Sequence, residues 1–352
     1  MAYISFKPTD FFNTLLYTGN GTTGHAITGV GFQADASFIK NRETTDVPNI
    51  SDSVRGANKY LITSGTDEEQ SGTENLQSWQ SDGFTVGNDN QFNQSADGYV
   101  SCHWKMGTTT GLSGGTITPS GYSIDATRKQ GVYAWTGTGT AGTIAHGLGT
   151  APDFVMVKKL NASGTYWTGY SSVFPNPTTE ENYWNSDDSI GGSSTSWNST
   201  ATTSTTFSLG SSNGINGSGN TYVGYVFAQV PGYSHFTKYV GNASASGPFT
   251  DCGFAPAWVI AKAINGAGSW YIWNNRRPGH DQIGKYLQLN SSSAEDDNTG
   301  NFGCEFTSTG FRVVGTHAGV NGNNIDYQVL AFAQTPLIGS DGTPATSWLG
   351  TV

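Results

Sequence analysis

The sequence predicts an all-β fold made of three tandem, jelly-roll-like β-sandwich repeats that follow a short N-terminal arm. Three observations support this prediction. Glycine accounts for 48 of the 352 residues, and the polar stretches between aromatic residues are typical of short strands joined by tight turns. Aromatic residues make up 12% of the chain, which is enough for cores that a disordered chain would lack. A strand-like motif also occurs three times.

The recurring motif is an apolar run that ends in lysine. It reads FQADASFIKNR at 32–42, TAPDFVMVKKL at 150–160 and FAPAWVIAKAI at 254–264. The runs are apolar on both alternating faces, so we expect strands that are covered on each side. The lysine then marks the point where the chain returns to solvent; these residues are Lys40, Lys158 and Lys262.

Other landmarks recur around this motif in a constant order. Each unit opens with an aromatic residue and a glycine turn, namely YTGNG at Tyr17, WTGTG at Trp135 and YVGNA at Tyr239. Each unit then has NKYLITS, ENYWNSD or GKYLQLN, later SDGFTVG, STTFSLG or STGFRVVG, and finally YVSCHWK, YVGYVFAQ or YQVLAFAQ. Such self-similarity indicates a repeat architecture. The unit length, about 95 residues, favours sandwiches over a solenoid, whose repeats are usually shorter.

These landmarks divide the chain into six parts. The spacing between unit starts shortens from 118 to 104 residues because a Gly/Thr/Ser-rich segment is added after the first unit. We expect that segment to be a linker or an added hairpin. The predicted parts are an anchoring arm (1–16), repeat 1 (17–105), the added segment (106–133), repeat 2 (134–230), repeat 3 (231–335) and a C-terminal tail (336–352).

Composition and charge argue against several classes of protein. The formal net charge is −10 and the 16 Lys and Arg residues are spread thinly, so the clustered cations that nucleic-acid binding requires are missing. No apolar run approaches the length of a membrane span, and the N-terminus lacks the pattern of a secretory signal. A polar, uncharged surface without an export route is expected of a virus particle protein, which folds in the cytoplasm and works outside the cell.

No motif of catalysis or metal binding stands out. The histidines are scattered, and the three cysteines each lie inside an expected strand, where buried thiols are the simplest interpretation. No nucleophile elbow or phosphate-binding glycine loop is present. We expect no catalytic residues and no cofactor. The one metal hypothesis is a structural Ca²⁺ ion at the oxygen-rich loop GNDNQFNQSADG (87–98), which lacks the alternating Asp ligands of an EF-hand.

Several of these segments together resemble a family. YTGNG, FQADASFIKNR, DSVRGANKYL, SWQSDGFTVG, YVSCHWKMGTTTG and LAFAQTPLIGSDGTPATS, with the opening MAYISFKPTDFFNTLLYTG, are similar to a group of uncharacterised virion proteins of marine bacteriophages. The segment QADASF departs from the family pattern, which has a proline and an aromatic residue there. The resemblance covers essentially the whole chain and implies a tail-fibre or other structural role, with no catalytic residues.

The arm carries apolar residues that suit anchoring to other virion proteins, either capsid or tail. These residues are Phe6, Phe11 and Phe12. Removal of residues 2–12 is expected to leave the repeats folded but to block incorporation into particles. Self-association as a homotrimer is a further partner hypothesis.

Tryptophans and arginines give two other candidate sites. Five tryptophans, if exposed, could stack on a host-surface glycan or on a partner protein; they are Trp167, Trp184, Trp197, Trp270 and Trp273. Tryptophans of this kind also fill sandwich cores. Arginines at matching places of repeats 1 and 3 could form ion pairs within the chain or at a subunit contact; they are Arg55, Arg276 and Arg277.

Three functions therefore compete. The first is a non-enzymatic tail-fibre or adhesin component that presents β-sandwiches to the host surface. The second is a capsid decoration or head-fibre protein held by its N-terminal arm. The third and most remote is a polysaccharide depolymerase. The repeats could be arranged in a line, which gives reach and multivalent contact, or around a pseudo-threefold axis that matches threefold sites on a particle.

Overall fold

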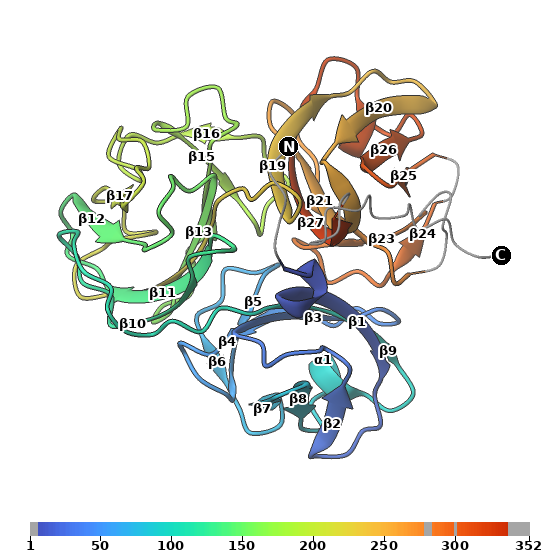
Figure 1. Ribbon diagram of the computed structural model, residues 1–352, viewed down its shortest axis with the longest axis horizontal. Coiled ribbons are helices and arrows are strands. Elements are labelled where there is room, and N and C mark those ends of the chain that lie inside the picture. The colour runs from blue at the N-terminus through green and yellow to red at the C-terminus, as the bar shows by residue number, and fades with distance from the viewer. Residues whose placement is uncertain (1–5, 278–283, 299–300, 337–352) are drawn as a thin grey trace.

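The computed structural model describes residues 6–277, 284–298 and 301–336 and is nearly all β (Figure 1). The all-β prediction is therefore confirmed. Three short helical turns interrupt the strands: η1 (Pro8–Asp10), α1 (Asn90–Asn93) and α2 (Ala318–Asn321). No helix in these ranges is long and apolar enough to cross a membrane.

The strands form three units, each with one large and one small antiparallel sheet. In unit 1 the large sheet has the order β1 (Phe12–Thr18), β9 (Gly98–Trp104), β3 (Ala36–Asn41), β4 (Asn49–Asp52), β5 (Lys59–Ile62) and β6 (Gln70–Ser71). The small sheet has the order β2 (His25–Thr28), β8 (Gly83–Val86) and β7 (Leu76–Gln80).

Unit 2 repeats this order with one additional edge strand. Its large sheet runs β10 (Gly121–Asp125), β11 (Gln130–Thr136), β18 (Thr221–Phe227), β13 (Phe154–Lys159), β14 (Thr168–Ser171), β15 (Glu180–Tyr183) and β16 (Gly191–Gly192). The small sheet pairs β12 (Gly142–Ala145) with β17 (Thr206–Leu209). The added strand β10 forms a hairpin with β11 and lies in the Gly/Thr/Ser-rich segment.

Unit 3 has the same order as unit 1. Its large sheet runs β19 (Ser234–Val240), β27 (Asp326–Pro336), β21 (Phe254–Ala263), β22 (Tyr271–Asn274), β23 (Lys285–Gln288) and β24 (Asp296–Asp297). The small sheet runs β20 (Ser246–Asp251), β26 (Gly310–Val314) and β25 (Gly303–Phe306). Because a jelly roll divides eight strands between two sheets, this uneven division does not confirm the jelly-roll part of the prediction.

The three units surround a common centre (Figure 1). One face of each large sheet contributes to a central aromatic cluster that includes Phe12 and Trp104 of unit 1, Phe154 of unit 2, and Trp258 and Phe332 of unit 3. The other face packs against the small sheet of the same unit, which gives three peripheral cores. The units therefore form a ring and not a line.

A buried asparagine fixes the same loop in each unit. Each unit contains Gly-x5-Asn-x5-Tyr, at residues 87–99, 210–222 and 315–327. The Asn93 amide donates to the carbonyl oxygens of Gly87 (2.7 Å) and Thr22 (2.9 Å), and its Oδ1 accepts from the Asn20 N–H at 2.8 Å. Asn216 and Asn321 make the equivalent bonds. The asparagine thus pins the opening turn of each unit to the loop before its closing strand.

The same contact explains the glycine in each opening turn. A Cβ atom on Gly19, Gly137 or Gly241 would lie 2.1–2.3 Å from a backbone oxygen of the pinned loop. The backbone N–H of each glycine donates to that loop, for example from Gly19 to the Asp97 carbonyl at 2.9 Å. The YTGNG, WTGTG and YVGNA turns are therefore close approaches of two backbone segments.

The expectation that the motif lysines mark the return to solvent is wrong. Lys40, Lys158 and Lys262 are all fully buried. Their ammonium groups donate to backbone carbonyls: Lys40 to Thr44 (3.1 Å), Lys158 to Thr165 (2.6 Å), and Lys262 to Ala263 (3.2 Å), Asp187 (3.3 Å) and Asp188 (2.7 Å). Burial lowers the pKa of each lysine to about 8, against the opposing influence of nearby carboxylates.

We predict that Asn93→Ala lowers the free energy of unfolding by about 2–4 kcal/mol, because it leaves several buried backbone groups without partners. Urea unfolding followed by tryptophan fluorescence measures the effect. Asn88→Ala is the matched control, since Asn88 lies in the same loop and is exposed. Equal stability of the two variants would show that the Asn93 bonds do not stabilise the loop.

We also predict that the free energy of unfolding rises between about pH 8 and pH 9. The unfolded lysines, with pKa values near 10.5, bind protons in this range that the folded lysines, with pKa values of about 8, have released. The gain ends near pH 9, because the buried thiols of Cys102, Cys252 and Cys304, whose pKa values are raised by burial, stay protonated where unfolded thiols lose their protons. Above about pH 10, buried tyrosines such as Tyr133, whose pKa is also raised by burial, lower the free energy of unfolding in the same way. Unfolding curves of Lys158→Met should show a smaller rise, whereas the exposed control Lys238→Met should retain it. A flat profile in the parent chain would contradict this prediction.

Candidate functional site

The five candidate tryptophans are all buried, so the hypothesis that they stack on a glycan at the surface is wrong. Trp167, Trp184 and Trp270 lie in the central cluster. Trp197 lies in the peripheral core of unit 2, and Trp273 in that of unit 3. These tryptophans are buried because the three units surround one another. Each large sheet is therefore covered on both faces, and its aromatic residues contact apolar side chains on either side.

Two of these tryptophans connect neighbouring units. The indole N–H of Trp167 donates to the carbonyl of Ile62 in unit 1 at 2.9 Å. The indole N–H of Trp270 donates to the carbonyl of Tyr183 in unit 2 at 2.8 Å. Trp184 lies between them, with ring centroids 5.6 Å and 6.0 Å away. These side chains therefore anchor the interfaces between consecutive units.

The arginines lie where units meet, and two of the three form ion pairs. Arg55 bonds Asp52 at 2.6 Å and Glu69 at 3.3 Å, and it also contacts the Tyr225 hydroxyl of unit 2 at 3.3 Å. Burial opposes the charge of Arg55, but Asp52, Tyr225 and Glu69 outweigh it and raise its pKa. The Tyr225 hydroxyl donates to Asp52 at 2.7 Å. This buried network joins unit 1 to unit 2.

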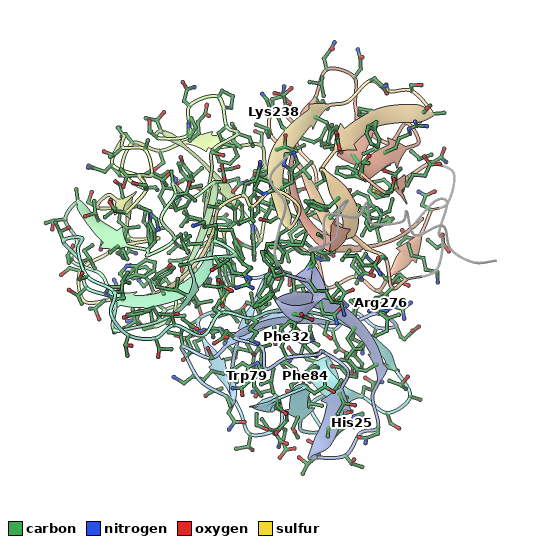
Figure 2. The ribbon with its side chains drawn as sticks, viewed as in Figure 1. His25, Phe32, Trp79, Phe84, Lys238 and Arg276 are labelled. Atoms are coloured by element: carbon green, nitrogen blue, oxygen red, sulfur yellow. The ribbon has the colours of Figure 1, made fainter. Side chains whose placement is uncertain are left out.

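The other two arginines lie where unit 3 meets unit 1. Arg277 is buried and bonds Glu295 at 3.2 Å. Arg276 is exposed and labelled in Figure 2; its Nε donates to the Thr14 carbonyl of unit 1 at 3.2 Å. Both contacts belong to the interior of one chain, so they need no second subunit.

The three phenylalanines of the arm do not share one environment. Phe12 is fully buried in the central cluster, where its ring stacks on Phe332 with centroids 4.8 Å apart. Phe12 therefore belongs to the core and is not free to anchor the chain elsewhere. The expectation that residues 2–12 can be removed without loss of folding is contradicted by this position. Residues 2–5 lie outside the described part of the chain.

Phe6 and Phe11 form a half-buried apolar surface beside the ring of three units. Their rings pack edge to face with centroids 5.5 Å apart, and Phe6 also contacts Tyr233 at 5.5 Å. The Arg128 guanidinium lies 3.3 Å from the Phe11 centroid and 4.3 Å from that of Phe6, and the Lys105 ammonium lies 5.5 Å from Phe11. Phe6, Phe11, Lys105 and Arg128 are called the arm surface below.

The loop proposed for Ca²⁺ uses its polar groups within the chain. The Asp89 carboxylate accepts from the Gln91 N–H at 2.8 Å, which caps α1, and the Asn93 amide bonds backbone carbonyls. Across residues 6–277, 284–298 and 301–336, no three or more His, Cys, Asp or Glu side chains are placed together for a metal ion.

Sequence inspection missed two sets of residues that organise the ring. The buried asparagines Asn93, Asn216 and Asn321 can be recognised in the sequence, since the Gly-x5-Asn-x5-Tyr spacing occurs once in each unit. The burial of the lysines carries no signal beyond their common position, because carbonyl partners such as those of Thr44, Thr165 and Asp188 lie in loops outside the motif. For Lys262 two of those carbonyls belong to unit 2, more than 70 residues away in the sequence.

Comparison with known proteins gives one clear match. A search of curated proteins finds no relative. Among solved structures, the crystal structure titled "Crystal Structure of the STIV MCP" aligns with 10% identity, over 65% of this chain and 92% of that chain, at a TM-score of 0.18. That score is too low to establish a common fold. A family model described as "Domain of unknown function (DUF7483)" matches residues 7–336. This match begins directly after Phe6 and spans all three units, and the chain belongs to the DUF7483 family.

Proposed function

We propose that the chain is a non-enzymatic structural component of a bacteriophage virion, held on the particle by its arm surface. The observation that carries the proposal is the ring itself. Three units close on one buried aromatic cluster, and the titratable groups with the largest pKa shifts are buried structural residues such as Lys158 and Tyr225. Such an arrangement suits a rigid, passive building block.

The arm surface supports attachment as a decoration protein on the particle. Half-buried aromatic rings beside cationic groups offer both apolar contact and charge to a partner. The ring also places three equivalent units around one centre, which suits a position of threefold symmetry on a capsid. We therefore favour the capsid surface as the location of this protein.

A second candidate is a tail-fibre or adhesin component, and one surface feature favours it. Tyr166 is 46% exposed and stacks on Tyr183 with ring centroids 4.6 Å apart. A stacked, exposed tyrosine pair is able to pack against a sugar ring. This pair replaces the buried tryptophans as the place to look for glycan contact.

Immunogold electron microscopy of intact phage particles distinguishes these locations. Label spread over the head supports the decoration role. Label confined to the tail supports the adhesin, and glycan-array binding that is lost in Tyr166→Ala would then be expected. Absence of label from both head and tail would refute the virion proposal altogether.

We predict that the double variant Phe6→Ser, Phe11→Ser folds but is depleted from particles at least about tenfold, the loss expected for about 1.4 kcal/mol of binding energy. The reason is that both rings are only half-buried in the isolated chain, so their removal costs binding more than folding. Quantitative immunoblotting of purified particles measures incorporation, and thermal unfolding checks the fold. Phe249→Ser, an exposed phenylalanine outside the arm surface, should be incorporated normally. Normal incorporation of the double variant would exclude the arm surface as the attachment site.

A further inference from the structure

The three units contact one another through one interface that is repeated around the ring. At each interface a backbone N–H of one unit donates to a carbonyl of the next. The bonds are Glu69 to Leu160 (2.9 Å), Ile190 to Ile264 (3.0 Å) and Glu295 to Arg42 (2.8 Å). Each unit therefore presents one face to the unit before it and a different face to the unit after it, which is a head-to-tail arrangement.

The interface between unit 3 and unit 1 differs from the other two because it joins the two ends of the chain. Units 1 and 2 are consecutive, as are units 2 and 3, so a short connection holds each of those pairs together. No such connection links unit 3 back to unit 1. This interface, called the closing interface below, is held by noncovalent contacts alone.

The closing interface also lacks the tryptophan anchor of the other two. Trp167 and Trp270 directly precede β14 and β22. In unit 1 the residue that directly precedes β4 is Pro48, which has no indole and no N–H to donate. A smaller contact replaces it, in which the Thr63 hydroxyl donates to the Leu289 carbonyl at 2.8 Å.

An ion pair between Glu295 and Arg42, called the clamp below, helps to hold the closing interface together. Glu295 of unit 3 accepts two hydrogen bonds from Arg42 of unit 1, at 2.7 Å and 3.0 Å. Burial would raise the pKa of Glu295, but Arg42 and Arg277 outweigh this and hold it below the usual value. Leu160 and Ile264 take the place of Arg42 at the other two interfaces. The arm adds apolar contacts, as Phe12 packs on Phe332.

We propose that the closing interface opens and that the opened chain makes the same contacts with a second copy of this chain. Unit 3 of one copy then leaves its own units 1 and 2 and binds units 1 and 2 of the other copy, which regenerates every bond of the ring between two molecules. Head-to-tail faces that are satisfied within one chain are equally satisfied between chains, and such exchange is an inexpensive route to dimers. This inference is independent of any role in a virion.

Unit 1 contains a matched control for the clamp. Glu69 bonds Arg55 at 3.3 Å and Lys59 at 3.1 Å, just as Glu295 bonds Arg277 at 3.2 Å and Lys285 at 3.7 Å. The difference is that Glu295 also bonds Arg42 across an interface, whereas Glu69 faces Leu160. Glu295→Gln and Glu69→Gln therefore remove equivalent carboxylates, but only Glu295→Gln loosens the closing interface.

Size-exclusion chromatography with light scattering on the full chain tests the proposal. Because the exchanged dimer regenerates the clamp, losing the clamp makes opening easier without favouring either form. We therefore expect dimers of Glu295→Gln and Arg42→Leu, isolated at high concentration and then diluted, to return to monomers about tenfold faster than dimers of the parent chain, a change of about 1.4 kcal/mol in the free energy of opening. Glu69→Gln should behave as the parent chain does. Exchange between monomer and dimer by the parent chain should become faster in about 1 M NaCl, which weakens the clamp by screening. A parent chain that forms no dimer at any concentration, or a Glu295→Gln variant that exchanges no faster than Glu69→Gln, would overturn the proposal.

A covalent lock separates ring opening from general loss of stability. Because the Glu295 N–H bonds the Arg42 carbonyl, the two backbones are close enough for the double variant Arg42→Cys, Glu295→Cys to be bridged by a disulfide. The three native thiols are buried and should not compete. Oxidised before concentration, this variant should remain monomeric, and after reduction it should form dimers. Dimers of the oxidised, internally bridged form would show that association uses another surface.

Discussion

The shared burial of one aromatic cluster by three sheets is the constraint on which the rest of the structure depends. Each large sheet has an apolar face that its own small sheet does not cover, and the faces of the other two units cover it instead. No unit can bury that face alone, so the three must assemble together. The packing is close: the cavity between the sheets holds about 30 Å³ and is lined by apolar side chains such as Trp104, Trp184 and Trp258.

The assembly of three units around one cluster explains why so many polar side chains are buried and bonded to backbone groups. The ends of β3, β13 and β21 lie beneath loops of their own unit or of the neighbouring unit, where Lys40, Lys158 and Lys262 bond backbone carbonyls. Lys262 then finds its acceptors in the carbonyls of unit 2, and Asn93 bridges two loops of unit 1. Buried polar groups are tolerated only where partners satisfy them. The carbonyls at the loop ends supply those partners in all three units.

The sequence alone was sufficient for the strand content and the recurring landmarks, because apolar runs and glycine turns are local signals. It was misleading for Lys158 and the tryptophans. A lysine after a strand and a Trp in a polar stretch both look exposed when only neighbours in the chain are considered. The ring of Trp167 packs against Trp184 and Tyr225, and its indole N–H bonds the Ile62 carbonyl, 105 positions away. Such contacts follow from how the units surround one another, which local periodicity does not encode.

The three interfaces show how one geometric position accepts different chemistry. Three residues after the equivalent strands β4 and β22, units 1 and 3 have Arg55 and Arg277, which bond Glu69 and Glu295; the equivalent strand of unit 2 is β14. Unit 2 has buried Phe174 at that position and Ile190 in place of the carboxylate. An ion pair and an apolar pair thus occupy the same place, and neither leaves an unpaired charge. The ring therefore requires complementarity at each interface, not a particular residue. A charged clamp at the closing interface follows from that freedom, since units 1 and 3 meet where no tryptophan is available.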